Sequence, residues 1–95
     1  MLNKLKIALL KARKEKDALR TAVLSFLLSA IHNKEIALRG KGETFGDEHI
    51  AQVIKTQIKQ RKESIEQYKT GGRQDLVDQE TAELGVLEEI SREYL

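Results

Sequence analysis

The chain of 95 residues contains no cysteine, proline or tryptophan, and aromatic residues make up only 4% of it. Without cysteine there is no disulfide framework, no thiolate nucleophile and no Cys-ligated zinc site. A reducing, cytoplasmic setting is therefore expected. The scarcity of aromatic rings also removes the platforms on which bases of single-stranded nucleic acid stack.

Long apolar runs are absent as well. The first ten residues are moderately apolar, but Lys4 and Lys6 interrupt them, and no small-residue cleavage site follows. No segment approaches the roughly 18–20 apolar residues that cross a bilayer. We therefore expect no signal peptide, no membrane anchor and no membrane partner.

Charge is nearly balanced overall but unevenly distributed. The net charge is +2, from 17 basic and 15 acidic side chains. Residues 1–40 carry nine basic and three acidic groups, whereas residues 76–95 carry one and six. Such a chain can neutralise itself by antiparallel packing, or it can present a basic face to an anionic partner.

Apolar residues recur at helical spacing almost throughout, and few positions read as strand. We predict a single all-α domain over residues 1–95, a small antiparallel bundle with helices at about 2–15, 18–39, 48–70 and 74–94. The second helix has the widest apolar face, with a predicted centre at Leu19, Val23, Phe26 and Ala30. A helix that is apolar over so wide an arc packs on two sides, so we place it in the middle of the bundle.

Short polar segments mark the helix ends. Asp17 is a suitable N-cap for the second helix. The glycine-rich stretch GKGETFGD reads as the main loop, and Thr44 or Asp47 within it would cap the third helix. Gly71-Gly72 supplies the left-handed backbone that stops a helix, so the chain reverses there as a helical hairpin.

Charged residues interrupt the apolar stripes of the last two helices. Arg61 falls in the stripe of the third helix, and Glu80 and Glu83 fall in that of the fourth. An unpaired buried charge costs several kcal/mol, and the hairpin brings these residues to a similar level. We predict that Arg61 pairs with Glu80 or Glu83. The pair is either a structural ion pair that sets the register or part of a polar cluster that recognises a ligand.

Basic residues line the outer face of the third helix and continue past the turn. They are Lys55, Lys59, Lys62, Lys69 and Arg73. A stripe of this kind is typical of a solvated helix face, but it also fits the phosphates of an RNA backbone. Because no aromatic residues interleave with it, such binding would follow backbone shape and weaken steeply with salt.

No motif for catalysis or metal binding is recognisable. His32 and His49 have no metal-ligand neighbours at helical spacing. The glycine-rich loop follows no strand and lacks the Gly-Lys-Ser/Thr ending of a phosphate loop. The Glu-x-x-His motif of carboxylate metal sites is also missing. We therefore expect no catalytic residue, no metal and no cofactor.

Several segments carry a family resemblance. They are Lys16-Asp17, AIHNKEI at 30–36, IKQRKESI at 58–65, Tyr68, GRQDL at 72–76, and Glu80 with Glu83-Leu84. In this combination the chain resembles the YqeY-like family, which is related to the tail of the B subunit of the glutamyl/aspartyl-tRNA amidotransferase. The departures are Ser25 in place of an arginine, a longer spacing before Tyr94, and no counterpart of the family's second helical half. The chain thus resembles the N-terminal half of a YqeY-like protein.

The resemblance implies a tRNA- or RNA-associated module and supplies no catalytic residue. The leading hypothesis is a non-catalytic helical module whose five basic residues named above meet tRNA phosphates. A second hypothesis is a protein-interaction adaptor, in which an apolar helix face docks another protein, a second copy or the missing C-terminal half. A third is an accessory role in carbon–nitrogen ligation with glutamine as amido-N-donor, by family association.

Overall fold

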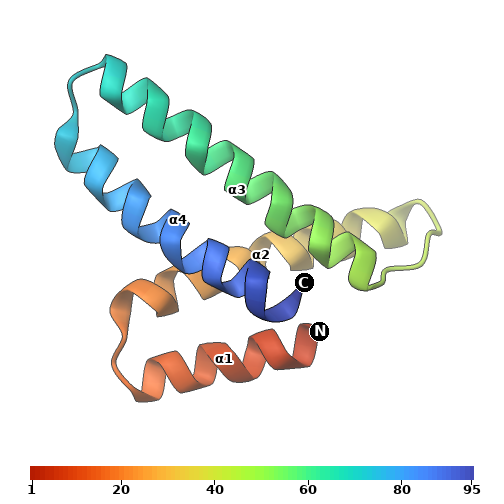
Figure 1. Cartoon of the computed structure of the whole chain (residues 1–95). Coiled ribbons are helices and arrows are strands. Elements are labelled where there is room, and N and C mark those ends of the chain that lie inside the picture. The colour runs from red at the N-terminus through yellow and green to blue at the C-terminus, as the bar shows by residue number, and fades with distance from the viewer.

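The computed structural model describes residues 1–95 and consists of four α-helices without a strand (Figure 1). The helices are α1 (Leu2–Lys14), α2 (Ala18–Gly40), α3 (Asp47–Thr70) and α4 (Gln74–Tyr94). The predicted all-α bundle is confirmed, and each helix boundary lies within one residue of its predicted position. None of the four helices contains a stretch that is apolar and long enough to cross a bilayer.

The bundle is built from two helical hairpins, α1–α2 and α3–α4. Helix α2 packs against each of the other three helices, in agreement with its wide apolar face. The turn between α3 and α4 extends away from α1 and α2, so the two hairpins diverge toward that turn (Figure 1). Helices α1 and α3 come together at their N-terminal ends, where the amino group of Met1 lies 3.7 Å from Oδ1 of Asp47, and they diverge from there (Figure 1).

Aliphatic side chains from all four helices form the core. Its ten buried residues are Leu5, Ala12, Val23, Leu24, Leu27, Ile31, Ile50, Ile54, Leu87 and Ile90. The predicted centre of the α2 face is wrong at two positions, because Leu19 is 39% exposed and Phe26 is 61% exposed. Both residues lie in the N-terminal half of α2. There the hairpins diverge, and α3 and α4 do not cover the whole apolar face.

The first three helices end in one shared backbone geometry. After each helix, an N–H donates to the carbonyl five residues earlier: Asp17 to Ala12, Glu43 to Leu38 and Arg73 to Tyr68, each at 2.9 Å. The residue before each donor is left-handed: Lys16 (φ 58°), Gly42 (φ 71°) and Gly72 (φ 71°). These are Schellman motifs, in which the left-handed position favours glycine. Gly71 is right-handed at φ −80°, so only Gly72 of the predicted pair ends the helix by a left-handed turn.

Helix α2 begins at the predicted N-cap. Asp17 has extended backbone angles, and its Oδ1 accepts a hydrogen bond from the backbone N–H of Arg20 at 3.0 Å. This bond satisfies one of the N–H groups that a helix N-terminus leaves without a partner.

Helix α3 begins differently from the prediction. Neither Thr44 nor Asp47 caps it, because the N-cap residue is Gly46, which has no side chain. Instead, the Gly46 N–H donates to Nδ1 of His49 at 3.0 Å. The His49 ring also stacks on Phe45, with 5.9 Å between the ring centroids. An imidazole one turn into the helix therefore anchors the end of the loop.

Candidate functional site

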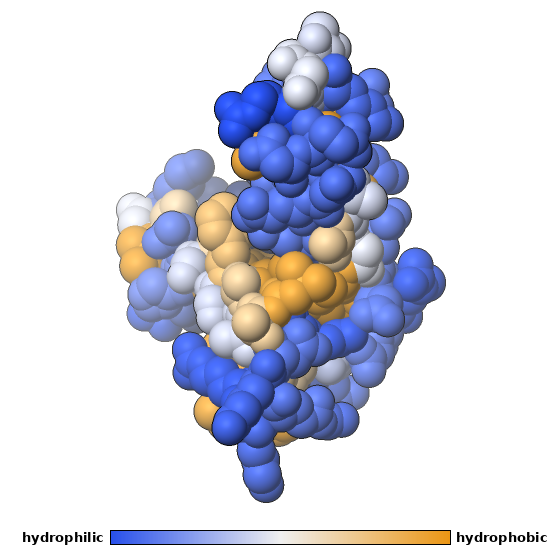
Figure 2. All heavy atoms as spheres, turned by 90° about the vertical axis from the view of Figure 1, so that its left-hand side faces the viewer, coloured by the Kyte–Doolittle hydropathy of each residue, from blue (hydrophilic) through white to orange (hydrophobic).

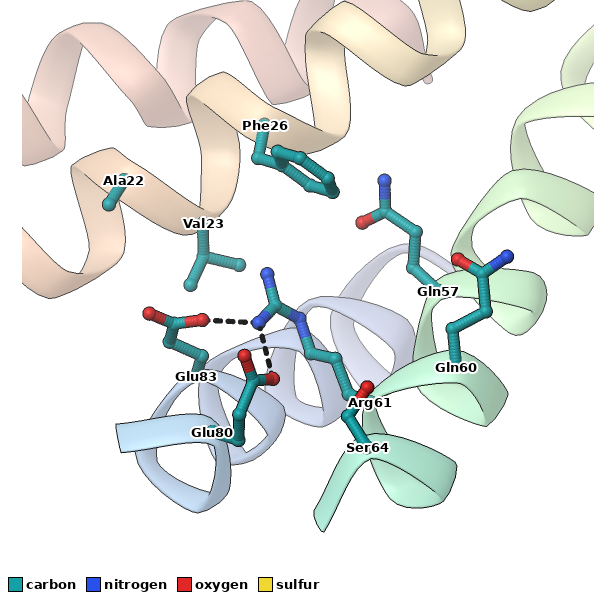
Figure 3. A pocket seen from close by; sticks show the side chains of 9 residues that line it. All are labelled: Ala22, Val23, Phe26, Gln57, Gln60, Arg61, Ser64, Glu80 and Glu83. Atoms are coloured by element: carbon teal, nitrogen blue, oxygen red, sulfur yellow. Dashed lines mark hydrogen bonds and ion pairs between the residues drawn. The ribbon is translucent and has the colours of Figure 1, made fainter. Parts of the chain in front are cut away.

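The three interrupting charges of α3 and α4 meet in one cluster (Figure 3). Nη1 of Arg61 lies 3.0 Å from Oε2 of Glu80 and also contacts Oε2 of Glu83. The side chains are 13%, 21% and 17% exposed, respectively. The sequence predicted one partner for Arg61, and the structure provides two. Because both carboxylates sit on α4 and the guanidinium on α3, the cluster fixes how the two helices align.

The cluster forms one wall of a cleft between α2, α3 and α4 with a volume of about 390 Å³. Ala22, Val23 and Phe26 of α2 form the opposite wall, as Figure 3 shows. The guanidinium carbon of Arg61 lies 5.7 Å from the centroid of the Phe26 ring, which is a cation–π distance. The exposure of Phe26 is thus explained in part, because its ring caps a charged group.

Gln57 of α3 is the buried polar residue in this region, with only 5% exposure. Its side chain points into the cleft beside Phe26 (Figure 3), and its Oε1 has no hydrogen-bond partner. A second hollow of about 510 Å³ continues from the cleft along α2 and α3, and Gln57, Gln60 and Phe26 line both. A buried carbonyl oxygen without a partner is costly, which distinguishes this oxygen from the other buried polar groups of the chain.

The basic residues predicted on the outer face of α3 are all exposed, but only some are free of acidic partners. Lys55, Lys59 and Lys62 make no ion pair, whereas Nζ of Lys69 lies 3.6 Å from a carboxylate oxygen of Glu66. We call Lys55, Lys59 and Lys62 the α3 basic strip. At 100° per residue, this strip faces away from the cleft.

Arg73 differs from the lysines of the strip. Its Nη2 lies 3.1 Å from Oδ2 of Asp75, and its Nε lies 3.3 Å from the other carboxylate oxygen. The hydrogen bond and the charge of Asp75 raise the pKa of Arg73, and the bond from Arg73 lowers the pKa of Asp75. The guanidinium already donates two hydrogen bonds to the carboxylate of Asp75, so Arg73 is the least available of the predicted residues for binding a phosphate.

The other concentration of basic residues lies on α1. Its exposed members are Lys4, Lys6, Lys11, Arg13 and Lys14, with Lys16 in the following turn. Helices α1 and α3 diverge from their adjacent N-terminal ends, so the two basic sets lie on different helices that separate toward Lys14 and Thr70 (Figure 1).

Apolar side chains are also accessible at the surface. Ile7 and Leu10 of α1 are 64% and 63% exposed and lie on one side of the helix, three residues apart. Figure 2 shows a further concentration in a hollow on the face at the left of Figure 1, enclosed by hydrophilic side chains. Exposed apolar residues that are grouped in this way are typical of surfaces that contact a partner.

No three histidine, aspartate or glutamate side chains come together where they could hold a metal ion. The two features that sequence reasoning missed are Phe26 and Gln57, which look like an ordinary core aromatic and an ordinary polar residue. A glutamine within the apolar stripe of α3, four residues before Arg61, is the one signal that was present in the sequence.

Comparison of the chain with known proteins identifies its family. Residues 2–95 match the family model described as Yqey-like protein. The chain is 39% identical over 84 residues to Altered inheritance of mitochondria protein 41 of Saccharomyces cerevisiae, covering 87% of the chain and 44% of that protein. The Lachancea thermotolerans protein of the same name is 40% identical over 91 residues, covering 96% and 46%. The chain thus spans less than half the length of the curated relatives it matches.

The names of these relatives also correct one expectation. Each is named as a mitochondrial protein, which contradicts the cytoplasmic location expected from the composition. The physical reason is that a chain without cysteine is indifferent to the redox state of its compartment, so its composition does not identify the compartment. The family match extends over nearly every residue that carried the resemblance. The chain therefore belongs to the Yqey-like protein family.

Proposed function

We propose that this chain is a non-catalytic helical module that binds the phosphate backbone of tRNA or another RNA through the α3 basic strip. The observation that carries the proposal is that Lys55, Lys59 and Lys62 project from one exposed face and make no ion pair. At 1.5 Å per residue they extend over about 10 Å along the helix axis. Three ammonium groups at this spacing can neutralise neighbouring phosphates without reading bases.

The size of the interface sets the expected salt dependence. Three phosphate contacts predict a slope of log Kobs against log salt of about −2 to −3. No aromatic side chain lies among the three lysines, so the base sequence should matter little to affinity. The module would thus recognise RNA by shape and charge.

A salt titration of tRNA binding tests the proposal. The wild type should show the slope given above, and Lys59→Glu with Lys62→Glu should reduce its magnitude by about 2. The matched control is Arg13→Glu with Lys14→Glu, which changes the net charge equally at the C-terminal end of α1. Binding without salt dependence in the wild type would refute the proposal. An equal loss in the control would show that net charge, and not the α3 basic strip, is responsible.

A second candidate function is that of a protein-interaction adaptor. The exposed pair Ile7 and Leu10 on α1 favours it, because the two large aliphatic side chains lie next to each other on one helix face and could dock on an apolar partner surface. If a second copy of the chain is the partner, sedimentation equilibrium should show a dimer that Ile7→Ser with Leu10→Ser dissociates. A wild type that stays monomeric at high concentration would argue against self-association.

A further inference from the structure

The cleft between α2, α3 and α4 has an excess of negative charge. Its charged lining residues are Glu80, Glu83 and Arg61, two carboxylates and one guanidinium. Arg61 uses one nitrogen for both glutamates and contacts Oε2 of each. Oε1 of Glu83 accepts from the amide of Gln79 at 3.3 Å, and Oε1 of Glu80 has no hydrogen bond. The cleft can therefore accept a second cation.

Gln57 adds an independent requirement for a donor. Its Oε1 is buried, points into the cleft and has no partner, so it is an acceptor that the chain leaves unsatisfied. Folded proteins rarely leave such an oxygen without a donor. The free oxygens of Glu80 and Gln57 both accept hydrogen bonds and donate none, so they select a ligand rich in N–H groups.

Phe26 completes the chemical character of the site. The ring is 61% exposed, and the Arg61 guanidinium lies at cation–π distance from it. An aromatic ring attracts a second cation as it attracts the first, and it packs well against an alkyl chain. With Ala22 and Val23 beside it, the α2 wall offers an apolar surface opposite the carboxylates.

We propose that this cleft binds an alkylguanidinium or alkylammonium group. The cationic head would donate to Glu80 Oε1 and Gln57 Oε1, and the alkyl chain would lie along Phe26 and Val23. A volume of about 390 Å³ is within the range of small-ligand sites. The site faces away from the α3 basic strip, so it does not depend on RNA binding. The cation has two sources, a free polyamine or the arginine or lysine side chain of a protein.

The direct test is a titration of the whole chain followed by NMR, with butylguanidinium as the probe and butylurea as its uncharged analogue. Butylguanidinium should produce saturable shifts of the Gln57 side-chain amide and of the Phe26 ring, and butylurea should not. Spermidine and a blocked Ala-Arg-Ala peptide then distinguish the two sources, because the tighter ligand identifies the class. Equal shifts with butylurea, or no shifts with any cation, would overturn the proposal.

Variants of single residues show which side chains contribute to the affinity for butylguanidinium. Glu80→Gln should weaken butylguanidinium binding at least about tenfold, because it replaces a charge-assisted hydrogen bond with a neutral one. Glu66→Gln removes the same charge from an exposed position on α3 outside the cleft and should leave the affinity unchanged. Phe26→Leu removes a largely exposed ring with little risk to the fold and should also weaken binding. Equal affinities of wild type, Glu80→Gln and Phe26→Leu would refute the site.

Discussion

Arg61 is the residue whose removal should reveal most about this fold. Its guanidinium is shared by Glu80 and Glu83, and all three side chains are about four-fifths buried or more. Arg61→Met keeps a side chain of similar length but leaves two carboxylates facing each other without a cation. The variant therefore tests whether the charges are structural or merely tolerated.

The expected loss follows from the burial of the three groups. Breaking a fully buried ion pair by removing one partner costs about 3–5 kcal/mol. The glutamates retain about a fifth of their exposure, so water screens them partly, and we expect Arg61→Met to cost about 2–4 kcal/mol. Glu80→Leu should cost less, because Arg61 keeps its contact with Glu83.

A double-mutant cycle in urea denaturation measures the coupling between these residues. Arg61→Met with Glu80→Leu should be less destabilising than the sum of the single changes by about 1–2 kcal/mol. The double variant still leaves Glu83 unpaired, so stability near that of the wild type should return only when Glu83→Leu is added. A loss below about 1 kcal/mol for Arg61→Met, or strictly additive single changes, would refute a structural role for the cluster.

The helix ends give three further predictions, each measured as the free energy of unfolding from urea curves by far-UV circular dichroism. Gly72→Ala should destabilise by about 1 kcal/mol because the residue is left-handed, whereas Gly71→Ala should be neutral or slightly stabilising; equal effects would contradict the assigned geometry. Lys16→Gly should stabilise by about 0.5–1 kcal/mol, since it removes a left-handed lysine, and any loss would argue against strain there. Asp17→Ala should cost about 1 kcal/mol and Asp17→Asn much less, since asparagine also caps.

Much of the fold follows from patterns of neighbouring residues that can be read in the sequence. The helix boundaries agree with prediction because apolar spacing and turn residues act within a few positions along the chain. The Arg61 cluster was also predictable. A charge in an apolar stripe demands a partner, and the glycine turn sets which residues face each other. Where local chemistry offers two solutions, as at the start of α3, the prediction of a cap at Thr44 or Asp47 was wrong.

The predicted phosphate-binding residues show what sequence patterns leave undetermined. The sequence supplied the cations, but it did not determine that the carboxylate of Asp75 binds the guanidinium of Arg73. This outcome depends on the rotamers that the two exposed side chains adopt at the start of α4, which residue spacing alone does not determine. The sequence supplied five exposed basic residues, and the structure shows that Lys55, Lys59 and Lys62 are those without an acidic partner.

By itself, the sequence determined the four helices, their approximate boundaries and the charged cluster that aligns α3 with α4. Periodicity and capping are properties of neighbouring residues, and burial penalties force a lone charge to find its complement. The tertiary structure alone decided that Phe26 faces solvent and that the oxygen of Gln57 points unpaired into a cleft. The reason is the divergence of the two hairpins, because the angle between packed helices depends on contacts distant in sequence.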